Sequence, residues 1–362
     1  MTATPDRPYL FHAFEVSYFS AKVRPALRYK RLWYDEVHAD YRLIQQRTGL
    51  TFIPMLITPD DETWQDSTDI YDRLEARHPD PPLFPATPVQ RIAAHLVELY
   101  TDEFALIPAM HYRWGSELGE ASARARFIAM VGDEERGSTA AARMAKARLA
   151  LGANDESAPA IEAHTHDLLD ALSTHFQAHP YLLGERMSFA DCALMGPLDG
   201  HLFTDLVSRK LLLETARPVV GWIERCNHPN APAQGEWLAD DALAPTLREV
   251  LTVMGQDAAP TLLNGLDVFE RWADTAPEDL EELPRAVGQI ESTLRGLPLV
   301  RFAGSYAPLL VQRVLDEYRT LDPATRKPVD EAVAGTGWEA VLAHEPRHRL
   351  AKRGFKLVLE TD

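Results

Sequence analysis

The chain has 362 residues, of which 46% are hydrophobic and 25% are charged, a balance typical of globular proteins with two or three domains. Its net charge of −17 at pH 7 repels phosphate backbones and anionic lipids, so nucleic acid and membrane surfaces are not expected partners. The two cysteines are too few for a disulfide framework, and there is neither an apolar signal core nor a run of about 18 apolar residues. We therefore expect a cytoplasmic protein with no membrane-spanning segment.

The first predicted strand and helix are joined by a turn that carries two serines. Residues 9–16 are an apolar run of strand length, and a basic helix follows up to Arg31. Ser17 or Ser20 can cap this helix with a side-chain oxygen, and we expect Ser20 to do so. Redox proteins of the thioredoxin type have Cys-x-x-Cys at such a junction, where the helix N-terminus lowers the pKa of a thiol. Because both positions are serine here, a thiolate held at this turn must arrive with a ligand.

The next segment has the composition of the remainder of a small mixed domain. Residues 51–57 are strand-like but contain Pro54, which cannot donate to a sheet ladder and so belongs at an edge, a bulge or a cis bond. A short returning strand can follow, and Asp66 and Ser67 then precede apolar residues at helical spacing. The predicted order is strand, helix, strand, helix, strand, strand, helix.

Helix signals dominate the chain after a proline-rich connector. Five prolines from Pro79 to Pro88 form a stiff, extended segment that marks a domain boundary. Ser188 and Asp191 have the spacing of a capping box at the start of a short apolar helix, and we assign them a folding role. Beyond residue 240, amphipathic segments predict three more helices and two short strands, at 298–302 and 355–359.

The order and spacing of four motifs resemble the glutathione transferase superfamily, which joins a thioredoxin-like domain to an all-helical domain. The motifs are Ser17-Tyr18-Phe19-Ser20 before Lys22-Val23-Arg24, Ile53-Pro54-Met55-Leu56, Asp66-Ser67-Thr68-Asp69-Ile70, and the Ser188/Asp191 capping box. The resemblance covers roughly residues 8–230. It implies an α/β thioredoxin-like glutathione-binding domain at 8–85 and an all-α C-terminal domain at 89–235, followed by a mainly helical region of unknown role at 240–362.

The resemblance implies that the serine turn faces the thiol of glutathione. A free thiol with a pKa near 8.5 is mostly protonated at neutral pH, so an enzyme that uses it must favour the thiolate. Ser17 would donate its O–H to the sulfur, with Ser20 and Tyr18 as alternatives, and would not be a covalent nucleophile. The simpler interpretation of Ser17 is a helix cap.

Two further motifs would anchor the tripeptide. Pro54 resembles the family's cis-proline, which turns the backbone of Ile53 outward so that it pairs with glutathione like an added strand. Asp66 and Ser67 would hold the ammonium and the carboxylate of the γ-glutamyl end. An edge-strand proline and a simple helix cap at Ser67 are the alternatives. The family often has Glu at the Asp66 position, so the shorter side chain has less reach.

Three residues are candidates for a substrate pocket, and none is expected to bind metal. Met110, Tyr112 and Trp114 lie on the stretch that in the family faces the active-site cleft, although aromatic residues at helical spacing also fit a helix core. Among clustered histidines, His175 and His179 share the spacing that places two ligands on one helix face, but no third ligand is evident. We expect no metal site.

The resemblance therefore implies an enzyme that activates the glutathione thiol for attack on a small apolar electrophile, with glutathione as co-substrate. A glutathione-dependent lyase, dehalogenase or isomerase would use the same site. A non-catalytic module for binding or assembly is the alternative from another class, and the long region at 240–362 makes it credible. A homodimer is also implied, unless that region blocks the usual interface.

Overall fold

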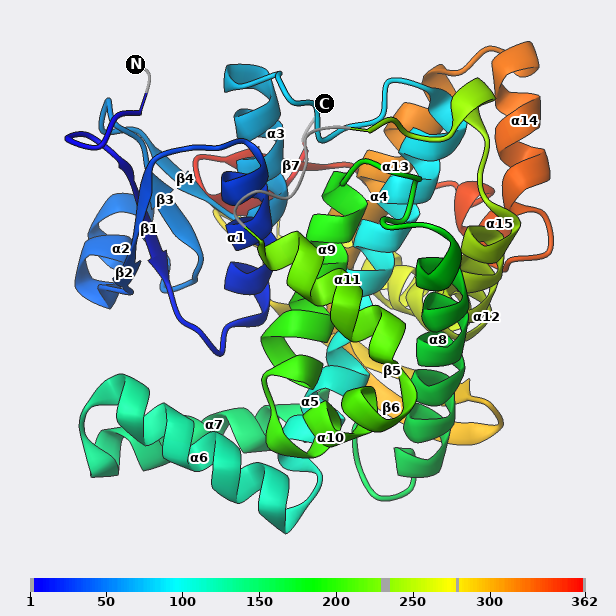
Figure 1. The fold of residues 1–362 in the computed structure, drawn as a ribbon. Coiled ribbons are helices and arrows are strands. Elements are labelled where there is room, and N and C mark those ends of the chain that lie inside the picture. The colour runs from blue at the N-terminus through cyan, green and yellow to red at the C-terminus, as the bar shows by residue number, and fades with distance from the viewer. Residues whose placement is uncertain (1–2, 229–234, 278–279, 361–362) are drawn as a thin grey trace.

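The computed structural model describes residues 3–228, 235–277 and 280–360. The first domain has the predicted order of elements (Figure 1). The four-stranded sheet has the order β2-β1-β3-β4, in which β1 and β2 are parallel and the other pairs are antiparallel. The elements are β1 (Tyr9–Ala13), α1 (Tyr18–Tyr29), β2 (Tyr34–His38), α2 (Tyr41–Thr48), β3 (Met55–Ile57), β4 (Thr63–Gln65) and α3 (Ser67–Arg77).

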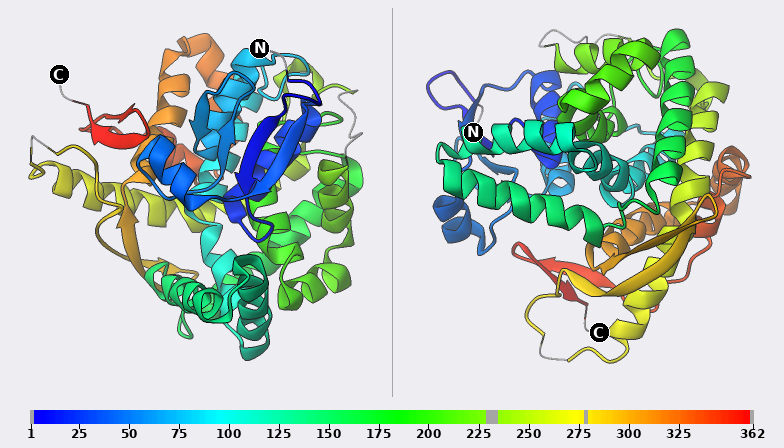
Figure 2. Two further views of the ribbon diagram at one scale, coloured as in Figure 1. Left: turned by 90° about the vertical axis from the view of Figure 1, so that its left-hand side faces the viewer. Right: turned by 90° about the horizontal axis from the view of Figure 1, so that it is seen from below.

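The second domain is helical, as predicted. Its helices are α4 (Pro88–Glu103), α5 (Leu106–Trp114), α6 (Glu117–Val131), α7 (Glu134–Ala150), α8 (Ala158–Ala178), α9 (Phe189–Pro197), α10 (Leu206–Thr215) and α11 (Arg217–Asn227). Helix α9 packs against both α1 and α4, and so joins the two domains. Helices α6 and α7 form a hairpin that projects beneath the first domain (Figures 1 and 2).

The capping box predicted at the start of α9 is confirmed. The Asp191 carboxylate accepts hydrogen bonds from the backbone N–H and the hydroxyl of Ser188, both at 2.9 Å. It also accepts from the Leu182 N–H at 3.0 Å and from the Trp222 indole N–H at 3.0 Å. The buried carboxylate is thus satisfied by four donors from three segments, which explains how one acidic residue in an apolar helix can fix the centre of this domain.

The region beyond residue 240 is mostly helical, with two strand hairpins. It contains α12 (Pro245–Ala273), β5 (Ala286–Leu294), β6 (Leu297–Gly304), α13 (Tyr306–Thr320), α14 (Pro323–Val333), α15 (Trp338–Leu342), β7 (Leu350–Arg353) and β8 (Lys356–Leu359). The prediction of separate helices around Leu247 and Leu262 is wrong, because α12 is a single helix that passes through Pro260. Its buried residues recur every three or four positions along its length, so one continuous face packs on the core. The two predicted strands are confirmed within β6 and β8.

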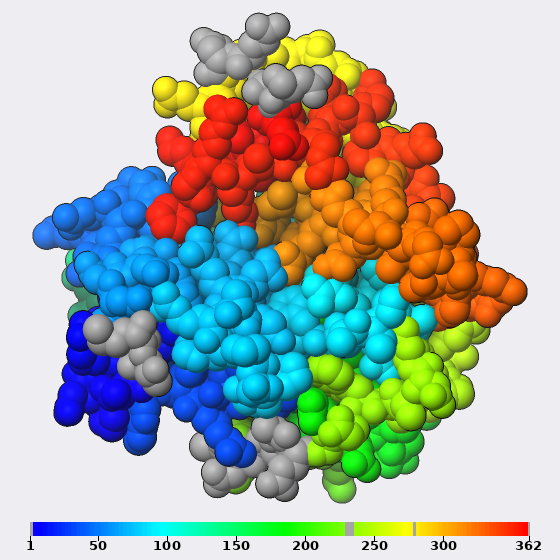
Figure 3. Space-filling view, turned by 90° about the horizontal axis from the view of Figure 1, so that it is seen from above, coloured from blue at the N-terminus to red at the C-terminus, as the bar shows by residue number. Residues whose placement is uncertain are grey.

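This C-terminal region packs on the first two domains and shares their main core. Leu310 and Val314 of α13 are buried in the same apolar cluster as residues of α3 and α4. Figure 3 shows the β7–β8 hairpin and α13 bordering the first domain and α4, with a hollow where they meet. Ion pairs that cross this border include those of Arg313 with Asp72 of α3 and of Arg91 of α4 with Glu317. No helix in the described ranges is long and apolar enough to cross a membrane.

A buried carboxyl group lies where β6 meets the end of α4. The guanidinium of Arg301 donates to the Glu103 carbonyl oxygen at 2.7 Å, and both side chains are buried. Burial raises the pKa of the Glu103 carboxyl to about 8, although the nearby Arg301 charge opposes the shift. The carboxyl is therefore neutral in the folded protein at pH 7, whereas in the unfolded chain its pKa is near 4.5 and it is ionised.

This difference predicts a pH-dependent stability that Glu103→Gln removes. Between pH 5 and 8 the Glu103 carboxyl holds a proton in the folded chain that the unfolded chain releases, so the contribution of this group to the free energy of unfolding falls as pH rises. In Glu103→Gln that fall should be smaller by about 2–4 kcal/mol, measured by urea unfolding at several pH values. Glu214→Gln, at an exposed site on α10, is the matched control. Parallel curves for the parent and Glu103→Gln would contradict the assignment.

Candidate functional site

The sheet brings three predicted stretches to one of its ends. In β3, Met55 pairs with His12 of β1 on one side and with Gln65 of β4 on the other. The turn after β1, the peptide before β3 and the start of α3 after β4 therefore leave the sheet at the same end. Elements that are up to about 50 residues apart in the chain, from Ser17 to Asp66, thus form one candidate site.

Ser17 caps α1, so the expectation that Ser20 is the cap is wrong. The Ser17 hydroxyl oxygen accepts a hydrogen bond from the Ser20 N–H at 3.2 Å, and the backbone of Ser17 is extended, as an N-cap requires. The side chain is partly exposed. A hydroxyl that accepts one hydrogen bond still has its own proton to donate. Capping and donation to a ligand thiolate are therefore compatible roles for this residue.

The two alternative hydroxyls at this turn point into the protein. The Tyr18 hydroxyl donates to the Thr101 carbonyl oxygen at 2.5 Å, and burial raises its pKa well above the usual value. The Ser20 side chain is completely buried, and its oxygen has no hydrogen-bond partner in the described part of the chain. Of the three hydroxyls, Ser17 is the one with access to solvent.

Arg113 of α5 holds the serine turn in place, a role that we did not predict. Its guanidinium donates to the carbonyl oxygens of Val16 at 2.9 Å and Gly200 at 2.8 Å, and it forms an ion pair with Asp205 at 2.6 Å. The side chain is buried. A charged residue between large apolar neighbours was the sequence signal for such a buried contact, but it does not indicate what the charge binds.

The Ile53–Pro54 peptide bond is cis, which confirms the predicted geometry. Within the described ranges, no group hydrogen-bonds to the backbone N–H or C=O of Ile53. The neighbouring Phe52 carbonyl accepts from the Gln65 side chain at 2.7 Å, and its ring lies 3.6 Å from the guanidinium of Arg285. The C-terminal region therefore reaches the peptide that is predicted to pair with glutathione.

Asp66, and not Ser67, caps α3. One oxygen of its carboxylate accepts from the Thr68 N–H at 2.9 Å, and Ser67 is the first residue of the helix and is buried. The other oxygen accepts from the Tyr306 hydroxyl at 2.5 Å and from the Lys352 ammonium at 3.1 Å. These two donors belong to the C-terminal region and were not predicted, because nothing near residue 66 in sequence indicates them.

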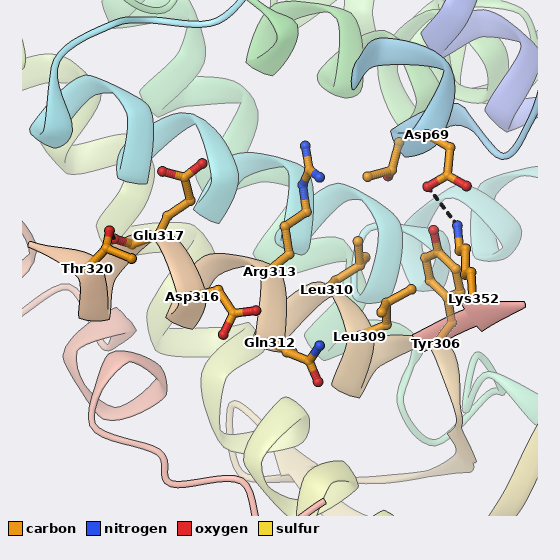
Figure 4. A pocket seen from close by; sticks show the side chains of 11 residues that line it. Asp69, Tyr306, Leu309, Leu310, Gln312, Arg313, Asp316, Glu317, Thr320 and Lys352 are labelled. Atoms are coloured by element: carbon orange, nitrogen blue, oxygen red, sulfur yellow. Dashed lines mark hydrogen bonds and ion pairs between the residues drawn. The ribbon is translucent and has the colours of Figure 1, made fainter. Parts of the chain in front are cut away.

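Lys352 lies between two carboxylates at the start of α3. Its ammonium is 2.9 Å from Asp69 and 5.4 Å from the centre of the Tyr306 ring. Burial acts to lower the pKa of Lys352, but Asp66 and Asp69 outweigh it and the pKa lies above the usual value. Figure 4 shows Asp69, Tyr306 and Lys352 at one end of a cavity of about 520 Å³ between α3 and α13.

The three predicted pocket residues do not come together. Met110 and Trp114 are each 3% exposed and lie in an apolar cluster with α6 and α7, where the Trp114 ring centre is 5.6 Å from that of Phe127. Tyr112 lies elsewhere, beside Glu162 of α8, and burial raises its pKa to about 12. No cluster of His, Cys, Asp or Glu suited to a metal ion occurs among the described residues.

Comparison with protein-family models identifies both domains. The model of the glutathione S-transferase N-terminal domain matches residues 11–82, and that of the glutathione S-transferase C-terminal domain matches residues 129–230. The chain belongs to the glutathione transferase superfamily. Its thioredoxin-like domain and its all-helical domain are those of the superfamily, and the C-terminal region lies outside both matches.

Solved structures of glutathione transferases are distant from this member of the superfamily. A transferase from Rhodospirillum rubrum F11 is 18% identical, with a TM-score of 0.43, over 67% of this chain and 99% of its own. The beta-etherase LigF from Sphingobium sp. strain SYK-6 is 17% identical, with a TM-score of 0.45, over 67% and 98%. A Methylobacterium radiotolerans transferase in complex with glutathione sulfonate is 19% identical, with a TM-score of 0.39, over 65% and 99%. No curated protein matches the sequence.

The position of Arg113 predicts that its charge is required for stability. Arg113→Met leaves Asp205 as a buried, unpaired carboxylate and two carbonyl groups without their donor, so the free energy of unfolding should fall by about 3–5 kcal/mol. Arg113→Lys keeps the charge and should lose less. Chemical denaturation measures the effect, with the exposed Arg209→Met as control. A loss below about 1 kcal/mol in Arg113→Met would contradict this role.

Proposed function

We propose that this protein is a glutathione-dependent transferase in which Ser17 stabilises the thiolate of bound glutathione. The observation that carries the proposal is the position of Ser17, a partly exposed N-cap at the end of the sheet where the cis peptide before Pro54 and the start of α3 also lie. The positive end of α1 and the serine O–H both favour an anion at this point. Such an environment lowers the pKa of a thiol.

The tripeptide would be anchored by backbone and side-chain groups at the same end of the sheet. The free N–H and C=O of Ile53 can pair with the cysteinyl peptide unit of glutathione as in an added strand. The N-terminus of α3, at Ser67 and Thr68, suits the γ-glutamyl carboxylate. Asp66, which caps this helix, supplies a negative charge for the ammonium of the γ-glutamyl end.

The chemical step would be attack of the glutathione thiolate on an electrophilic carbon of a small apolar molecule. The sulfur electron pair forms the new S–C bond, the leaving group departs with its bonding pair, and the thiol proton passes to solvent. Ser17 keeps its own proton and donates a hydrogen bond throughout. A glutathione-dependent lyase, dehalogenase or isomerase would start from the same thiolate.

A non-catalytic binding or assembly module is the second candidate. The observation in its favour is that Tyr306 and Lys352 already donate to the Asp66 carboxylate, which glutathione would otherwise use. Binding of glutathione separates the two candidates. The homodimer and the cytoplasmic location remain predictions.

The proposal predicts that the Ser17 hydroxyl controls the acidity of the bound thiol. Ser17→Ala should raise the pKa of bound glutathione, followed by thiolate absorbance, and lower kcat/KM with a generic electrophile about 10- to 100-fold, since one hydrogen bond to an anion is lost. Ser17→Thr, which keeps the hydroxyl, should retain most of the activity. Glutathione binding is measured calorimetrically in all variants.

The matched control separates donation from capping. Ser116 caps α6 as Ser17 caps α1, accepting from the Gly119 N–H at 3.1 Å, so Ser116→Ala should lose about 1 kcal/mol of stability and no activity. If the parent does not bind glutathione at millimolar concentration, the enzyme proposal fails. If Ser17→Ala turns over like the parent, the proposed role of Ser17 in thiol activation is wrong.

A further inference from the structure

The C-terminal region places a fixed cation at the start of α3. Lys352 is 286 residues from Asp66 in sequence, yet its ammonium contacts both Asp66 and Asp69. The side chain is 19% exposed and lies against the Tyr306 ring. Figure 4 shows the ammonium directed towards Asp69 from the strand that carries Lys352.

The strand that carries Lys352 is itself held to α13. Gln312 of α13 accepts from the Leu350 N–H at 2.8 Å and donates to the Leu350 carbonyl at 3.0 Å, so one buried side chain satisfies both groups of this residue. The Leu283 N–H donates a hydrogen bond to the Leu357 carbonyl oxygen, which holds β8, the other strand of the hairpin. Lys352 is two positions after Leu350, the residue held by Gln312, which limits how far the ammonium can move from the carboxylates.

The contacts at Asp66 leave little room for a second cation. One of its oxygens already accepts two donors, Tyr306 and Lys352, and the other accepts the Thr68 N–H. A ligand ammonium that approached Asp66 would meet the like charge of Lys352 a few ångströms away, and repulsion at this distance in a half-buried site is substantial. A ligand carboxylate at the α3 N-terminus would instead meet both the helix N–H groups and a lysine ammonium.

We propose that Lys352 takes the place of the ligand's α-ammonium at Asp66, so that the site selects a thiol tripeptide by the free α-carboxylate of its γ-glutamyl residue and does not require its α-amino group. This inference rests on the proposed function and adds a specificity-determining residue from the C-terminal region to the site. It assigns to that region a direct role in ligand choice.

The test compares two ligands that differ only in the amino group. Glutathione and glutaryl-cysteinylglycine, in which hydrogen replaces the α-amino group, are titrated calorimetrically into the parent, Lys352→Met and Lys356→Met. Lys356 lies in the same hairpin but pairs with Glu282 at 3.5 Å, away from α3, and is the matched control. Lys352→Arg keeps a positive charge at this position and is measured as well, so that the proposal is still tested if Lys352→Met does not fold.

The expected result is that Lys352→Met changes which of the two ligands, glutathione or its glutaryl analogue, binds more tightly. The parent and Lys356→Met should bind the analogue at least as tightly as glutathione, and Lys352→Met should bind glutathione at least tenfold more tightly than the analogue. Lys352→Arg should behave as the parent does. A parent that prefers glutathione tenfold, or a preference unchanged in Lys352→Met, would overturn the inference and leave the proposed function in place. Failure of the parent to bind either ligand would overturn the proposed function and this inference with it.

Discussion

The contact of Tyr306 and Lys352 with Asp66 is the constraint that ties the C-terminal region to the start of α3. It joins a strand near the end of the chain to the helix that opens the predicted ligand site, through a carboxylate that also caps that helix. A half-buried carboxylate without these donors would carry an uncompensated charge beside Asp69. The C-terminal region is therefore part of the first domain's electrostatics as well as of its packing.

The same constraint changes what a residue in the site can do. The resemblance to two-domain members implied that Asp66 would be available to hold the ammonium of a ligand. In this structure the Asp66 carboxylate already accepts hydrogen bonds from Tyr306 and Lys352, and the Lys352 ammonium supplies the positive charge beside it. The serine turn is independent of this change, since Arg113 holds it from the helical domain and Ser17 caps α1 within the first domain. In the proposed function, thiol activation and recognition of the γ-glutamyl end would therefore be controlled by different parts of the protein.

Local signals made much of the fold predictable from the sequence. The order of the first domain, the cis bond before Pro54 and the Ser188/Asp191 capping box depend on residues a few positions apart, and all three are confirmed. The choice between Ser17 and Ser20 as cap was not fixed locally, because either serine can accept from a nearby N–H. The contacts of Lys352 and Arg113 could not be predicted from the sequence, because a charged residue does not reveal which distant residue will pair with it. The segments around Leu247 and Leu262 were predicted as two helices, but α12 is a single helix, because its buried face continues past Pro260.

Hydrogen–deuterium exchange with and without glutathione tests most directly the central claim, that the C-terminal region forms part of the ligand site. Slower exchange on adding glutathione is predicted in peptides that cover Ile53 and the start of α3, and also in β7 at residues 350–353, because the ligand carboxylate would restrain Lys352. Helix α14, on the far side of α13 from the site, should be unchanged and serves as the internal reference. Protection confined to the first domain, with β7 exchanging as it does without ligand, would contradict the account.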